Sequence, residues 1–269
     1  MSEEPKVLTQ VEILFDVIVF IVIWTLISLP ILILLQIIGM RYSSLLLPHT
    51  VIMVYLALKR YKTDPFKAIG FEISKAIIFQ IIIYSIIGGF LLTVIVLIFI
   101  LLNFASIHWV INYTHLNILV IPIIDTLLSA GVEELIFRGY IVNVLSLKFS
   151  ERDTILLSAF FFAFMHLATP AFNLIAFFHL FIAGIALAII YLKTHSIYTV
   201  IAFHFSWNFF EGEIFGLPVS GHASEGILIV KVINNAILTG GAYGPEGGLI
   251  GLFIIGIFTI ILYVIYSKK

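Results

Sequence analysis

The chain has 269 residues, of which 62% are hydrophobic and only 11% are charged. Soluble domains average about 45–50% apolar and about 25% charged residues, so this composition excludes an ordinary soluble domain and indicates an integral membrane protein. The formal net charge of −1 gives no reason to expect a nucleic-acid partner. The sequence has no cysteine, which excludes disulfides, thiolate metal sites and cysteine nucleophiles.

Long apolar segments follow one another along the whole chain. A spanning helix needs about 20 mainly apolar residues. We therefore expect an all-α, polytopic protein with about eight transmembrane helices and a single membrane-embedded domain over residues 1–269. In chain order the expected spans are 11–37, 43–58, 76–103, 117–147, 153–168, 172–192, 196–211 and 248–266.

The basic residues predict the orientation of these spans. With Arg138 placed inside the membrane and the N-terminus in the cytoplasm, only Arg41 and Lys231 face outward. Such an asymmetry is what the positive-inside rule predicts, so we expect a multi-pass protein of the cell membrane with both termini cytoplasmic. The inward-facing residues are Lys6, Lys59, Arg60, Lys62, Lys67, Lys75, Lys148, Arg152, Lys193, Lys268 and Lys269.

Ionisable residues inside spans cost about 2.5–3.5 kcal/mol each on insertion scales, and three expected helices concentrate them. In the helix 117–147, Glu134 and Arg138 stand four positions apart, on one face, which predicts an ion pair. Glu133 points about 100° away from Glu134 and is free to face a cavity. His166 lies in the next expected helix, and His204 and Asn208 share a face of the seventh.

These polar residues also match in depth. Glu133, His166, His204 and Asn208 lie 11–15 positions from the basic residue at the cytoplasmic end of each helix. At about 1.5 Å per residue they are roughly 16–22 Å deep, which predicts one shared polar site. The alternative is that polar pairs only hold helices together, at about 0.6 kcal/mol on average. We interpret the other ionisable residues in or near spans as structural: Asp16, Asp125, His179 and Glu211.

The composition of this set indicates amide hydrolysis without a covalent intermediate. A carboxylate beside an imidazole can activate water. A His/Asn pair can donate hydrogen bonds to a developing oxyanion. The sequence contains neither the His-Glu-x-x-His zinc motif nor a Gly-x-Ser-x-Gly nucleophile elbow.

The motifs resemble the CAAX prenyl protease and bacteriocin-processing (CPBP, or Abi) family of intramembrane proteases. Its pattern is Glu-Glu-x-x-x-Arg, then Phe-x-x-x-His, then His-x-x-x-Asn or Asp. All three motifs occur here in order, within residues 117–211, which we take as the catalytic core helices. The matching residues are Glu133, Glu134, Arg138, Phe162, His166, His204 and Asn208.

The resemblance implies a glutamate-type endopeptidase without a cofactor. Glu133 and His166 would activate the attacking water, and His204 and Asn208 would form the oxyanion hole. Glu134 and Arg138 would support the site. The substrate would be a membrane-associated peptide or protein. The eukaryotic branch of the family removes the last three residues of prenylated CAAX proteins.

Two other hypotheses remain open. Glu133, His166 and His204 could instead bind Zn²⁺ as an open catalytic site, which would make the protein an intramembrane metalloprotease. Alternatively the protein is not catalytic and acts as a bacteriocin-immunity factor, scaffold or transporter.

Overall fold

The computed structural model describes residues 8–37, 43–62, 64–108 and 120–267. Over these residues the protein is mostly helical. Four basic residues used for the orientation, Lys6, Arg41, Lys268 and Lys269, lie outside the described residues, as does the segment 117–119 of the fourth expected span.

Each expected span corresponds to helical structure. The fourth is a composite, in which α6 (Val120–Glu134) continues into a π-helix η1 (Leu135–Val142) and a short α7 (Asn143–Leu145). Four helices, α1, α4, α9 and α12, are long and apolar enough to cross a membrane, which indicates a multi-pass membrane protein. The other seven expected spans correspond to α1 (Gln10–Ile37), α2 (Ser43–Leu58), α4 (Lys75–Leu101), α8 (Glu151–Met165), α9 (Leu174–Thr194), α10 (Ile197–Phe209) and α12 (Leu249–Ser267).

Short elements fill the two long connections. The basic connection after α2 contains α3 (Pro65–Ile69), and a π-helix η2 (Phe210–Ile214) extends α10. Two strands, β1 (Ala105–His108) and β2 (Ile229–Val232), pair antiparallel, so the all-α expectation is wrong at this point. Four-residue strands are too short for their alternation to be recognised in sequence. The remaining elements are α11 (Ala236–Thr239) and the 3₁₀ turns η3 (Gly241–Tyr243) and η4 (Pro245–Gly247).

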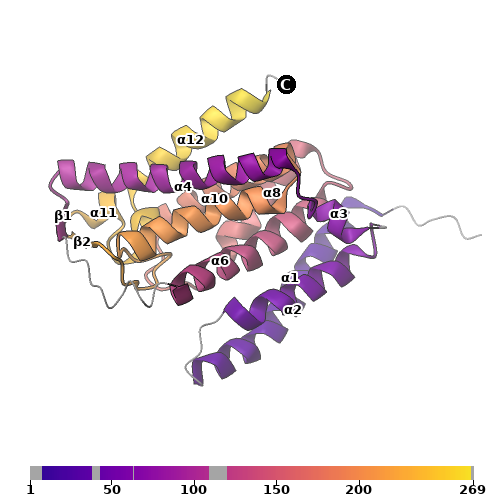
Figure 1. Ribbon diagram of the computed structural model, residues 1–269. Coiled ribbons are helices and arrows are strands. Elements are labelled where there is room, and N and C mark those ends of the chain that lie inside the picture. Colours follow the sequence, from indigo (N-terminus) through magenta and orange to yellow (C-terminus); the bar gives the residue numbers. More distant parts are fainter. Residues whose placement is uncertain (1–7, 38–42, 63, 109–119, 268–269) are drawn as a thin grey trace, which may run out of the picture.

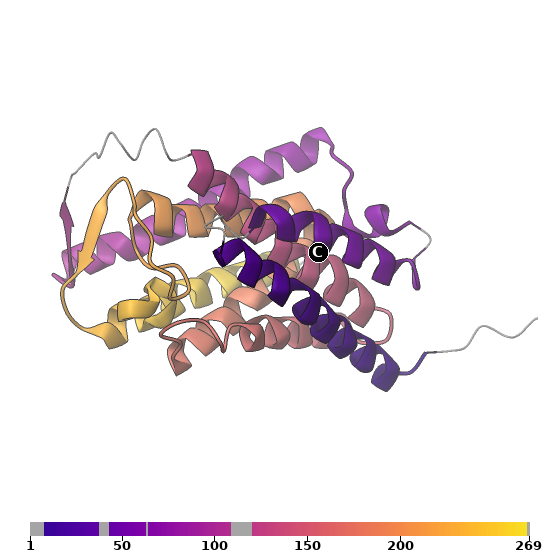
Figure 2. The ribbon, with the colours of Figure 1, turned by 90° about the horizontal axis from the view of Figure 1, so that it is seen from below.

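The helices pack around α10, which lies in the middle of the molecule. It packs against α4 on one side and α6 on the other, while α9 packs against both α8 and α12. Helices α1 and α2 lie beside each other at one flank, and the β1–β2 pair lies at the end of α4 opposite α3 (Figures 1 and 2). This arrangement places the polar residues of α6, α8 and α10 next to one another.

Polar N-caps set where the site-bearing helices begin. Ser150 caps α8, Asn173 caps α9 and Ser196 caps α10, and each side chain accepts a hydrogen bond from the backbone N–H three residues later. Such caps satisfy one of the free N–H groups at a helix start. They therefore fix the longitudinal position of the residues that follow, His166 and His204 included.

Two glycines allow these helices to approach closely. A Cβ added at Gly88 of α4 would lie 2.6 Å from the carbonyl oxygen of Phe203 in α10. A Cβ added at Gly184 of α9 would lie 2.9 Å from Cα of Ala159 in α8. Small residues at helix contacts let backbones approach within membranes, where packing replaces the hydrophobic effect. These two contacts thus set the positions of α10 and α8.

Candidate active site

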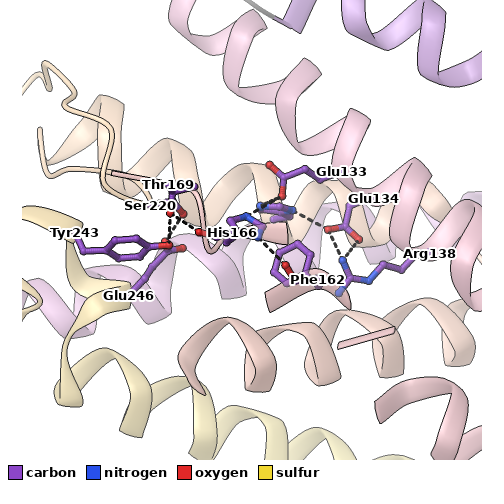
Figure 3. A network of polar contacts seen from close by, with 10 residues as sticks. Glu133, Glu134, Arg138, Phe162, His166, Thr169, Ser220, Tyr243 and Glu246 are labelled. Carbon is purple, nitrogen blue, oxygen red and sulfur yellow. Dashed lines mark hydrogen bonds and ion pairs between the residues drawn. The ribbon is translucent and has the colours of Figure 1, made fainter. Parts of the chain in front are cut away.

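An ion pair between Glu134 and Arg138 forms the base of the site (Figure 3). Nη1 of Arg138 lies 3.0 Å from each oxygen of Glu134, and both side chains are fully buried. Nη2 donates to the carbonyl oxygen of Gly184 at 3.0 Å, which ties this helix to α9. The guanidinium carbon lies 4.8 Å from the ring centre of Phe162. The pair that the four-residue spacing predicts is therefore confirmed.

The Glu134 carboxylate also binds His204, a contact that the sequence does not predict. Nδ1 of His204 lies 2.7 Å from Oε1 of Glu134. A carboxylate paired with an arginine only accepts hydrogen bonds, so Nδ1 of His204 carries the proton of this bond. The other ring nitrogen, Nε2, faces Glu133 and lies 4.0 Å from its Oε2 atom.

His166 is held in a similar way by a backbone group. Its Nδ1 atom donates to the carbonyl oxygen of Phe162 at 2.7 Å, since a carbonyl can only accept. Nε2 is thereby directed towards Glu133, with 3.6 Å between Nε2 and Oε2. His166 follows the last residue of α8 as its C-cap, whereas the sequence predicts it within a helix. Its backbone lies where the helix ends and the chain turns.

Glu133 faces both imidazoles, as its direction away from Arg138 predicts. Its Oε2 atom is buried and has no hydrogen-bond partner among the described residues. A separation of 3.6 Å between two polar atoms is too long for a good direct hydrogen bond and suits a bridging water. A neutral His166 offers a lone pair at Nε2. One water between the side chains can therefore donate one hydrogen bond to Nε2 of His166 and one to Oε2 of Glu133.

A cavity joins the four residues predicted to carry the chemistry. Glu133, His166, His204 and Asn208 all line it. Water can occupy about 40 Å³ of this cavity. One water needs about 10–15 Å³ on the same measure, so there is room for about two to four. The structure therefore brings the four residues together around one cavity that holds a few waters, as their matching depth predicts. These residues are Glu133, His166, His204 and Asn208.

Other residues of the cavity wall were not predicted. Ser220 and Glu246 come from the long connection between α10 and α12, and they reach the cavity through the fold of that connection. His179 of α9 and Trp207 of α10 also line it. Trp207 follows His204 by three positions, so helical spacing could have placed it near the site. Glu246 offers only the weak signal of a carboxylate just before an apolar helix.

The zinc hypothesis finds no preformed site. Among residues 8–37, 43–62, 64–108 and 120–267, no group of three or more His, Asp or Glu side chains is placed to hold a metal ion. Even so, both imidazoles present Nε2 towards Glu133 while their Nδ1 atoms are bound elsewhere. Metal-ligating histidines commonly have such second contacts. Metal binding therefore stays a prediction to be tested on the protein.

Comparison with known proteins identifies the part of the chain that carries this site. No curated protein matches the chain. Residues 115–210, however, match the family described as type II CAAX prenyl endopeptidase Rce1-like. The matched segment runs from before α6 to the end of α10 and contains all the residues that carry the three motifs. The resemblance to the CPBP family is thus confirmed, and residues 115–210 form an Rce1-like type II CAAX prenyl endopeptidase domain.

Proposed function

We propose that this protein is an intramembrane endopeptidase that hydrolyses a peptide bond of a membrane-associated peptide or protein. The observation that carries the proposal is the approach of two imidazole nitrogens, from His166 and His204, to one carboxylate oxygen of Glu133 in a water-sized cavity. The family of residues 115–210 supports a peptide as the substrate. It also makes a prenylated CAAX-type protein the first substrate to test.

Glu133 and His166 act together on the attacking water. Both present acceptor atoms to the space between them, so a water held there is oriented with its oxygen free to attack a carbonyl carbon. Glu133 takes a proton as the water attacks. General-base catalysis of this kind typically contributes about 10²–10⁴-fold.

His204 and Asn208 stabilise the oxyanion that the attack creates. For His204 to donate from Nε2 while Nδ1 is bound to Glu134, the ring must carry both protons as an imidazolium. The charges support this state. With Glu133 and Glu134 negative and Arg138 positive, a protonated His204 makes the buried group neutral overall. Asn208 donates from the same face of α10, one turn further on.

The cavity wall favours an endopeptidase over a carboxypeptidase. Among the described residues, the lining contains neither lysine nor arginine, so it offers no permanently charged cation to a free terminal carboxylate beside the scissile bond. We also propose that residues 1–269 form a single membrane-embedded domain, with 117–211 as its catalytic core. We further propose eight spans with both termini cytoplasmic, as the basic residues predict.

The test of this function is the isosteric variant Glu133→Gln. It keeps the shape of the side chain and removes the base, so it should abolish cleavage of a lipidated C-terminal peptide in detergent or vesicles. The melting temperature should stay close to that of the wild type, because Glu133 makes no hydrogen bond among the described residues through its buried oxygen. Glu72→Gln, at an exposed site outside the cavity, is the matched control and should cleave normally.

Each alternative predicts a different result. Full activity in Glu133→Gln would contradict the proposed mechanism. One Zn²⁺ per purified chain, with activity lost to a chelator and restored by the metal, would identify a metalloprotease. A wild-type protein that cleaves no lipidated or unlipidated peptide, while folded, would favour the non-catalytic hypothesis.

A further inference from the structure

A second carboxylate, that of Glu246, lines the same cavity as Glu133. It lies in η4, just before α12, and its residue is only 6% exposed. Glu133 and Glu246 lie on either side of His166 in Figure 3. The proposed mechanism gives Glu246 no part, so its presence in the cavity needs an explanation.

The surrounding connection holds Glu246 in place. Oγ of Ser220 donates to Oε2 of Glu246 at 2.6 Å, and Ser220 itself lines the cavity. The turn before Glu246 requires glycine at position 244, because Gly244 has φ +96° and an added Cβ there would lie 1.9 Å from the carbonyl oxygen of Pro218. The Glu246 carboxyl is therefore held at the cavity wall by its hydrogen bond to Ser220 and by the close packing of the preceding turn.

A polar chain links this wall to His166. Oγ1 of Thr169 donates to the carbonyl oxygen of His166 at 2.8 Å and lies 3.3 Å from the hydroxyl of Tyr243 (Figure 3). Tyr243 and Glu246 stand three positions apart in the same connection. These contacts join the segment that carries Glu246 to the segment that carries His166.

The surroundings of Glu246 favour its neutral, protonated form. No lysine or arginine lines the cavity among the described residues, and the apolar side chains of Leu180 and Ile255 form part of its wall. Burial raises the pKa of the Glu246 carboxyl, and the hydrogen bond from Ser220 together with positive charge on His166 and His204 opposes this shift only in part. Two carboxyl groups in one site commonly divide into a base and an acid when their environments differ.

We propose that Glu246 is the proton donor to the amine leaving group of the proposed peptidase. This inference rests on the proposed function. The attack of water on the carbonyl carbon transfers one proton to Glu133 and forms the tetrahedral intermediate. The carboxylic acid of Glu246 then protonates the amide nitrogen, the C–N bond breaks, and its electron pair stays on the nitrogen. The proton on Glu133 passes through cavity water to Glu246, which restores the starting state of both carboxyl groups.

The experiment compares an amide with an activated ester of the same acyl peptide. An amine must be protonated to leave, whereas a p-nitrophenolate leaves as an anion without help. Glu246→Gln should therefore lower the turnover of the amide by about 10²–10³-fold, within the range of general-acid effects. The same variant should lower the turnover of the p-nitrophenyl ester by less than about threefold. Glu72→Gln is the control and should change neither rate.

The outcomes separate this inference from the proposed function. Equal losses for amide and ester in Glu246→Gln, or no loss for either, would overturn the role of Glu246 while leaving the peptidase intact. Retention of both activities in Glu133→Gln would overturn the proposed function itself. If Glu246→Gln fails to fold, Ser220→Ala is the second variant. It should lower the amide rate more than the ester rate, by about 10-fold, and equal effects there would also contradict the inference.

Discussion

His204 and Arg138 bind the same carboxylate, since Nδ1 of His204 lies 2.7 Å and Nη1 of Arg138 lies 3.0 Å from Oε1 of Glu134. Glu134 therefore connects a fully buried cation to an imidazole that lines the cavity. A buried anion shared in this way stabilises positive charge on the imidazole. Glu134 is therefore more than a partner for Arg138: its contact with His204 is a specific way in which it supports the site.

The first prediction concerns the charge of Glu134. Glu134→Gln keeps an acceptor for His204 and removes the negative charge that stabilises its imidazolium form; it also removes the counter-charge of Arg138, so the kinetics are measured on the folded fraction of the variant. We expect kcat to fall by about 10²–10³-fold, the size of losing one oxyanion donor. KM should change far less, because substrate binding does not depend on that charge. Steady-state kinetics on a cleavable lipidated peptide would measure both. An unchanged kcat would show that His204 does not act as a charged donor.

A second prediction concerns stability. Arg138→Ala leaves Glu134 buried without its partner and removes the hydrogen bond to the carbonyl oxygen of Gly184. Breaking a buried pair typically costs about 3–5 kcal/mol. The yield of folded protein and its melting temperature in detergent should both fall. Arg138→Lys keeps the charge and should fall less. If Arg138→Ala melts like the wild type, the pair is not structural.

The contact between α8 and α9 can be tested through Gly184. Gly184→Ala places a Cβ 2.9 Å from Cα of Ala159, and overpacking of this kind costs about 1–3 kcal/mol. Gly256→Ala is the matched control, because an added Cβ there meets nothing within 4 Å. In the middle of α12 it should be neutral or stabilise by about 0.5–1 kcal/mol. Equal melting temperatures for the two variants would show that the helices separate without cost.

The orientation can be tested by cysteine labelling, because the native chain has no cysteine to interfere. A single cysteine placed at Lys269 should react with a membrane-impermeant reagent only after the membrane is opened. A cysteine at Ser224, in the connection between α10 and α12, should react in intact cells. Labelling of position 269 from outside would overturn the proposed topology.

Local spacing predicted much of the site. The four-residue interval of Glu134 and Arg138 predicts their pair, and the depth of His166 and His204 predicts that they meet. Glu246 could not be predicted, because its place depends on how a glycine-rich connection folds back over the cavity. The bond between Glu134 and His204 depends on the rotation of two helices about their axes, which depth alone does not fix.

The fold, too, was predicted where it depends on local sequence and missed where it depends on distant contacts. Long apolar segments mark the helices, because a helix that crosses the hydrocarbon core of a membrane must be apolar along its length. The ends of the helices were therefore predicted to within a few residues. The strands β1 and β2 exist through their pairing with each other, across more than 100 residues of sequence. A single sequence carries no local sign of such a distant partner.

The π-helix Leu135–Val142 affects the direction in which Glu133 and Glu134 point. Its wider turns hold more residues than α-helical turns do, so the chain between Glu134 and Asn143 contains slack that an α-helix would not have. Deleting one residue there would let the stretch close as an ordinary α-helix. The direction of Glu133 and Glu134 relative to the helix beyond Asn143 would then change, because each residue of a π-helix turns by a smaller angle than a residue of an α-helix. The protein would keep its helical content after such a deletion, but Glu133 and Glu134 would no longer point into the cavity. The number of residues in this stretch is therefore part of what builds the site.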